Sequence, residues 1–155
     1  MLNPIKEIVR FNREAGLINQ GYDDFLESSF QIEEALEGFN FPSAMAKLGL
    51  PISTDPTPKN FSRFLVASAI DEHKFSIPDV DRLDKACDAV VFAVGSMAKL
   101  GLKPQEITKA LNVVMHVNFA KLQCPKDEFG KLTKPADFVG PESQLQLILD
   151  ARSSK

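Results

Sequence analysis

Three glutamates interrupt the apolar face of a helix predicted near residues 22–39, and they constrain this chain more than any other feature. At roughly 100° per residue, the apolar side chains of this stretch share one broad arc. They are Phe25, Leu26, Phe30, Ile32, Leu36 and Phe39. Glu33 and Glu37 fall inside that arc, and Glu34 lies at its edge, one turn before Glu37. Because carboxylates directed at a core are costly unless they are neutralised, a bound divalent cation is the simplest explanation.

A second acidic set lies on the helix predicted over residues 76–100. Asp81, Asp84 and Asp88 are spaced by three and four residues, so they share one helix face. Asp88 is the only charged residue between Ala86 and Val94, and we therefore expect it in a shielded environment. Carboxylates from two helices can surround a hard cation with oxygen ligands. The alternative is that both sets are solvated helix faces, and the pattern alone leaves both interpretations open.

Residues typical of helix N- and C-termini predict where the helices of the chain begin and end. Asn3-Pro4 and Gly16 bound a first helix, and Gly101 ends the long one. The predicted helices cover residues 3–15, 22–39, 57–74, 76–100, 103–122 and 142–149, with a short one at 43–48. In the helix at 57–74, we expect Phe61, Phe64 and Leu65 to be buried. No strand-like alternation of useful length is present, so the predicted class is all-α.

The expected architecture is a compact bundle of about five or six helices in one domain over residues 1–155. Residues 123–155, which are rich in proline and glycine at their start, are predicted to form an ordered loop and a short last helix. Short helices with much apolar surface commonly complete their core against another subunit. We therefore expect a homodimer or homotetramer.

Charge and hydropathy exclude several functions. The net charge is −3, which gives no electrostatic case for binding nucleic acid or anionic membranes. The longest nearly uncharged run, Ala86 to Met97, is too short to span a bilayer, and the N-terminus lacks the pattern of a secretory signal. The two cysteines share no short metal-ligand spacing. We expect a cytoplasmic protein that contacts neither membrane nor nucleic acid.

Several motifs occur in an order that resembles a known family. They are Glu33-Glu34-x-x-Glu37, Asp84-Lys85-Ala86-Cys87-Asp88-Ala89-Val90-Val91-Phe92, Gly101-Leu102, and Asn118-Phe119-Ala120-Lys121-Leu122. This order resembles the MazG-like all-α nucleotide pyrophosphohydrolases. The segments Glu128-Phe129-Gly130-Lys131-Leu132-Thr133-Lys134-Pro135 and Phe138-Val139-Gly140-Pro141 are similar to the C-terminal part of the relatives grouped with phosphoribosyl-ATP pyrophosphohydrolases. The resemblance covers most of the chain between Ile5 and Leu149.

The resemblance implies an enzyme that hydrolyses a nucleoside or deoxynucleoside triphosphate to the monophosphate and pyrophosphate, with Mg²⁺ or Mn²⁺ as cofactor. Such a reaction suits the removal of non-standard nucleotides from the nucleotide pool. Glu33 would complete the metal shell or orient the attacking water. The implied metal ligands are Glu34, Glu37 and Asp88. The implied phosphate contacts are Asn118, Lys121, Lys131 and Lys134.

Two features depart from the family pattern. The second motif of the family reads Glu-x-x-Asp, but Lys85 occupies the position of its glutamate, with Asp84 one residue earlier. The segment from Asn40 to Arg82 is also longer than is usual. Asp84 would then act as the further metal ligand. Lys85 would lie near a phosphate, or its presence would weaken catalysis. The alternative function is accordingly a protein that binds nucleotide or a helical partner without turnover.

Overall fold

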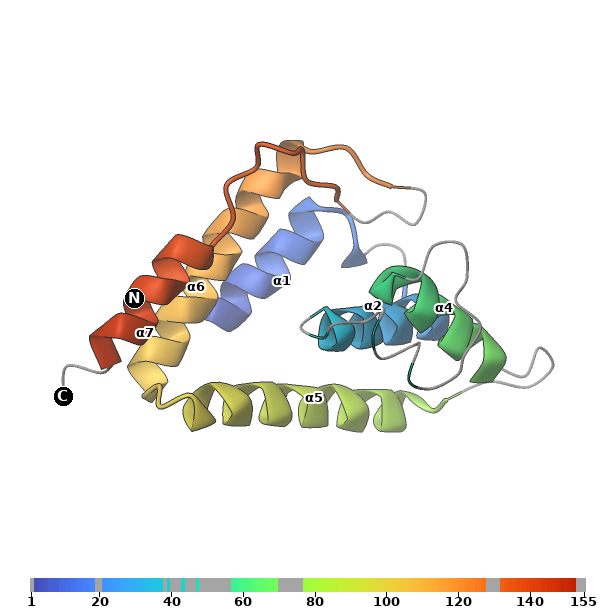
Figure 1. The fold of residues 1–155 in the computed structure, drawn as a ribbon. Helices are drawn as coiled ribbons and strands as arrows, with labels where there is room; N and C mark the ends of the chain where they lie inside the picture. Colours follow the sequence, from blue (N-terminus) through green and yellow to red (C-terminus); the bar gives the residue numbers. More distant parts are fainter. Residues whose placement is uncertain are drawn as a thin grey trace. The chain divides into compact units, whose positions relative to one another are not determined.

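The computed structural model describes residues 2–18, 21–37, 39, 43, 47, 57–69, 77–127 and 132–152. Regular structure in these residues is helical, apart from one isolated antiparallel bridge between Lys126 and Leu132 (Figure 1). The helices are α1 (Pro4–Glu14), α2 (Asp24–Leu36), α4 (Pro58–Ala69), α5 (Asp79–Lys99), α6 (Pro104–Ala120), the 3₁₀ helix η2 (Lys121–Gln123) and α7 (Glu142–Arg152). The predicted all-α class is confirmed.

Two compact units make up the chain. The first comprises Met1–Asn19 and Ile77–Lys155, and therefore holds α1, α5, α6, η2 and α7. The second, Gln20–Ser76, holds α2 and α4. The short helix predicted at 43–48 falls almost entirely outside the described residues, as does the end of the helix predicted at 57–74.

The predicted caps of α1 and α5 are present. Asn3 Oδ1 accepts hydrogen bonds from the backbone N–H groups of Ile5, at 3.0 Å, and Lys6, at 3.4 Å. Gly16 follows α1 with φ 73°, and Gly101 follows α5 with φ 87°. These left-handed conformations strain any residue with a Cβ atom, which is why the two glycines mark the helix ends correctly.

Asp23 caps α2, so this helix begins two residues later than predicted. Asp23 Oδ1 accepts hydrogen bonds from the N–H groups of Phe25, at 2.9 Å, and Leu26, at 3.0 Å. Asp23→Ala is expected to lower the free energy of unfolding by about 1 kcal/mol, because two helix N–H groups lose their acceptor. Urea unfolding followed by circular dichroism measures the change. Asp23→Asn retains the acceptor, so an equal loss in that variant would contradict the capping role.

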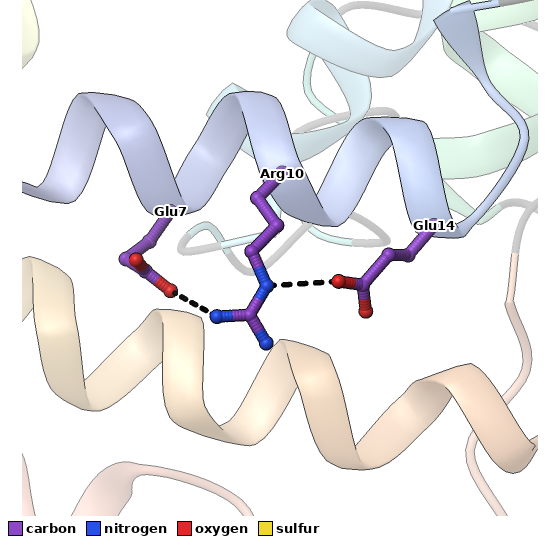
Figure 2. A network of polar contacts seen from close by, with 3 residues as sticks. All are labelled: Glu7, Arg10 and Glu14. Carbon is purple, nitrogen blue, oxygen red and sulfur yellow. Dashed lines mark hydrogen bonds and ion pairs between the residues drawn. The ribbon is translucent and has the colours of Figure 1, made fainter.

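In the first unit, α1 runs parallel to α6 and packs against it. Asn112 Nδ2 donates to the carbonyl of Leu2 at 3.1 Å, and the Phe11 and Phe119 rings meet edge to face with centroids 5.8 Å apart. The Arg10 guanidinium lies 4.4 Å from the Phe119 centroid. Glu14 and Glu7 hold that guanidinium at 2.8 and 3.2 Å (Figure 2). The hydrogen bond to Glu14 is the chief cause of the raised pKa of Arg10. The two carboxylates orient the guanidinium beside the Phe119 ring.

The apolar core of the first unit joins the end of α5 to α6 and α7. Its buried members are Leu102, Ile107, Ala110 and Ile148, and the half-buried residues Met97, Leu111, Val113, Leu145 and Leu149 pack against them. Arg152, at the end of α7, donates a hydrogen bond to the carbonyl of Leu100. This bond satisfies a carbonyl at the end of α5, which has no partner within its own helix.

The second unit pairs α2 with α4 through small and polar side chains. The buried residues of this pair are Ser29, Glu33, Ser62 and Val66. The expectation that Phe64 and Leu65 are buried is wrong, since they are 68% and 44% exposed. Ser62 and Val66, one turn apart, lie on the buried side of α4, and Phe61 is half-buried. Phe64 lies on the opposite side of the helix.

Candidate nucleotide and metal site

The acidic cluster lies in the last two turns of α2. Glu33 is 6% exposed, which confirms its prediction inside the packed face, and Glu34 is exposed as its place at the edge of the arc suggests. Glu37 is also exposed, so its prediction inside the packed face is wrong. α2 ends at Leu36 rather than Phe39, so Glu37 lies at the C-terminal end of the helix, where packing does not cover it. Glu37 becomes the C-cap residue, and its N–H donates to Glu33 O at 3.1 Å.

Glu33 is one of three buried polar residues of α2 and α4. Ser29, one turn earlier on α2, and Ser62 on α4 are almost completely buried. Ser62 Oγ donates to the carbonyl of Lys59 at 2.9 Å. Among the described residues, the buried hydroxyl of Ser29 has no hydrogen-bond partner. Buried polar groups ordinarily do have one, so the neighbourhood of Glu33 suits a polar occupant such as an ordered water.

The acidic residues of α5 are all exposed, and Lys85 is half-buried. The expectation of a shielded environment for Asp88 is therefore wrong. Phe92, within the apolar run that suggested burial, is 73% exposed. Within the first unit, α5 joins the core through its C-terminal end, where Met97 packs, and the preceding turns carry their apolar side chains on the surface.

The end of α6 places Asn118 and Lys121 side by side. Lys121 Nζ donates to Asn118 Oδ1 at 2.7 Å, and both residues are half-buried. Asn118 Nδ2 lies 3.9 Å from Met115 Sδ. The predicted spacing of one helical turn is confirmed. Because the hydrogen bond fixes the direction of the ammonium, the pair can present donors to an anionic ligand.

The segment after α6 folds back on itself. The carbonyl of Pro125 accepts hydrogen bonds from Thr133 N, at 2.8 Å, and Thr133 Oγ1, at 2.9 Å. Lys134 follows directly and is exposed, whereas Lys131 lies outside the described residues. The sequence motifs do not indicate Lys126, whose Nζ donates to the carbonyl of Ala15 at 2.6 Å. A contact across 111 positions leaves no signal in local spacing.

The proposed ligands are divided between the two units. Glu33, Glu34 and Glu37 belong to the second unit, and Asp84 and Asp88 to the first. Throughout the described parts of the chain, no group of three His, Cys, Asp or Glu side chains is gathered so as to hold a metal ion. The donor chemistry nevertheless suits Mg²⁺, which prefers carboxylate oxygens and solvent. Lys85, for its part, adds a positive charge between the two aspartates.

Comparison with known proteins returned no match to any family model, curated protein or solved structure. The family resemblance therefore rests on the sequence motifs alone. No helix within the described ranges is both long and apolar enough to cross a lipid bilayer.

Proposed function

We propose that the protein is a Mg²⁺-dependent nucleoside triphosphate pyrophosphohydrolase, which converts an NTP or dNTP to the monophosphate and pyrophosphate. The observation that carries the proposal is the geometry of α2. A buried carboxylate, Glu33, is followed within one turn by the exposed carboxylates of Glu34 and Glu37. A buried carboxylate beside two exposed ones at the end of a helix is an arrangement typical of functional sites, and it therefore favours a chemical role.

The proposed metal ligands are Glu34 and Glu37 on α2 together with Asp84 and Asp88 on α5. All four residues are exposed on the surface of their helices. Bound there, Mg²⁺ or Mn²⁺ would polarise the phosphoryl oxygens and lower the pKa of a bound water. Both helices carry these acids on spacings of three or four residues, which lets neighbouring carboxylates share one side of each helix.

The protein's own groups would act on the water and on the leaving group. Burial limits the motion of Glu33, so its carboxylate can orient an attacking water and accept the proton released by the attack. Lys121, held by Asn118, would offset the charge that develops on the departing pyrophosphate. Lys85, Lys131 and Lys134 are further proposed phosphate contacts, because an ammonium group provides three donors to phosphate oxygens.

Lys121→Met is expected to raise the KM for the nucleotide about tenfold or more, because a charge-assisted hydrogen bond to phosphate is lost. Methionine has a similar length and helix propensity, so the end of α6 should remain folded. Steady-state kinetics on the wild type and variant measure the change. The control is Lys109→Met, a lysine within α6 that is exposed and outside the proposed site. Equal effects in both variants would contradict a specific role for Lys121.

The direct test is pyrophosphate release from a panel of ribo- and deoxyribonucleoside triphosphates, with Mg²⁺, with Mn²⁺ and with chelator. We expect turnover of at least one nucleotide, equimolar monophosphate and pyrophosphate, and complete loss in chelator. Orthophosphate in place of pyrophosphate would assign a different cleavage position. Absence of turnover across the panel would overturn the proposed reaction.

The second candidate is a protein that binds nucleotide or a helical partner without catalysis. It is favoured by Lys85 in the second acidic motif and by the exposed apolar side chains of α5. These are Val80, Leu83, Val90, Val91, Phe92 and Val94. A surface of this kind is typical of helices that associate, and we propose a homodimer or homotetramer for either function. Nucleotide binding measured by calorimetry, without product formation, would favour this candidate.

A further inference from the structure

Lys126 connects two segments that are far apart in the sequence. Its ammonium donates to the carbonyl of Ala15, the C-cap residue of α1. Carbonyl groups at a helix C-terminus lack partners within the helix and carry partial negative charge, so an ammonium forms a charge-assisted hydrogen bond there. Gly16 comes next and has a left-handed backbone, and a Cβ atom added to it would lie 3.9 Å from Lys126 Nζ.

Lys126 is also the first residue of the turn that leads to Lys134. Its backbone pairs with Leu132 in the antiparallel bridge, and the adjacent carbonyl of Pro125 accepts both hydrogen bonds from Thr133. On the other side, Cys124 N donates to the carbonyl of Lys121 at 2.8 Å. The base of this turn consists of residues 125–126 and 132–133. Lys126 connects it to the end of α1, and the residue that precedes this base, Cys124, is hydrogen-bonded to Lys121, the partner of Asn118.

We propose that Lys126 is a positioning residue of the candidate site, which acts by fixing the base of the turn to the C-terminal end of α1. Lys134, next to Thr133, is thereby held near the segment that follows Asn118 and Lys121. A cation held in place before the ligand arrives loses less conformational entropy on binding than a mobile one. This inference rests on the proposed function, because it assigns Lys134 to phosphate binding.

The anchor itself is tested by amide hydrogen exchange on the full chain. In Lys126→Met, the Thr133 amide is expected to exchange about tenfold faster, since one charge-assisted hydrogen bond no longer holds the turn closed. Amides of the core helices α6 and α7 should be unchanged. Lys126→Arg keeps the charge and the donors, and should restore slow exchange at Thr133. Equal exchange in the wild type and Lys126→Met would overturn the anchoring role.

The functional consequence is tested with magnesium pyrophosphate as the ligand, by titration calorimetry. Lys126→Met and Lys134→Met should each weaken binding about tenfold, and Lys126→Arg should stay within about threefold of the wild type. The double variant should bind no more weakly than Lys134→Met alone, because Lys126 acts through Lys134. Lys109→Met is the control for loss of one positive charge and should bind as the wild type does.

The outcomes separate this inference from the proposed function. Additive losses in the double variant, about a hundredfold in all, would show that Lys126 contacts the phosphate itself and would overturn positioning. If the wild-type chain neither binds pyrophosphate nor releases it from nucleotides, the proposed function fails, and the role of Lys126 toward a phosphate ligand fails with it. In that case the exchange at Thr133 still shows whether Lys126 anchors the turn.

Discussion

Glu37→Gln is expected to lower pyrophosphate release from nucleoside triphosphates at least a hundredfold, because glutamine is a neutral and much weaker ligand for Mg²⁺ than glutamate. The side chain is exposed and the substitution is nearly isosteric, so packing is unaffected. Steady-state kinetics across a range of Mg²⁺ concentrations measure the effect. If the role is ligation, part of the lost rate should return at high Mg²⁺.

The stability of the same variant distinguishes loss of chemistry from loss of fold. Glu37 caps the C-terminal end of α2, where a negative charge opposes the helix dipole. Removing that charge should leave the free energy of unfolding unchanged or raise it by a few tenths of a kcal/mol. The matched control is Glu27→Gln, in the first turn of the same helix and outside the proposed site. A variant Glu37→Gln with wild-type kcat and KM would remove Glu37 from the site.

Ile148→Ala is expected to lower the free energy of unfolding by about 3 kcal/mol, the typical cost of removing a large aliphatic side chain from a packed core. Ile148 is 4% exposed and belongs to the cluster that joins α6 and α7 to the segment after α5. Truncation leaves a cavity that its neighbours fill only partly. Urea unfolding, monitored by circular dichroism with the slope compared between variants, measures the effect.

The neighbouring residue provides the control for this prediction. Leu147→Ala removes a similar side chain from the same helix, but Leu147 is 68% exposed. Its cost should be below about 0.5 kcal/mol, as is usual for surface substitutions. Similar losses at both positions would indicate that α7 is covered by another chain, so the two variants should also be compared by sedimentation.

Local chemistry predicted the helices well, because their ends are set by short-range interactions. Asn3 and Gly16 bound α1 as expected, and Gly101 ends α5. The error at α2 has a local cause as well. The predicted apolar arc includes Phe39, but the helix stops at Leu36, and Glu37 is its exposed C-cap residue. Helical periodicity assigns a face only as far as the helix extends.

The buried faces of α4 and α5 were harder to predict, because hydrophobicity does not say which neighbour is present. On α4, the large residues Phe64 and Leu65 are exposed, while Ser62 and Val66 are buried. On α5, an almost continuous apolar run indicated burial for Asp88, yet the residue is exposed. Periodicity describes which side chains share a side of a helix, whereas burial depends on what packs there.

In the candidate site too, the spacing of residues followed from the sequence, whereas their burial depended on tertiary packing. The spacing of Asn118 and Lys121 by itself placed them one turn apart, and their 2.7 Å hydrogen bond follows from the geometry of a single helix. The spacings of the acidic residues on α2 and α5 likewise come from the sequence. Whether a carboxylate is buried, as Glu33 is, or exposed, as Glu34 and Glu37 are, was decided by the packing of α4 on α2.

The sequence by itself determined the all-α class, the ends of α1, the C-terminal end of α5 and the residues that share each helix side, since these depend on interactions within about one turn. Only the tertiary structure decided that Ser62 rather than Phe64 is buried, and that Lys126 reaches the carbonyl of Ala15 across 111 positions. Such contacts depend on which segments the fold brings together. Local spacing carries no information about them, because the chain between the two partners can take many paths.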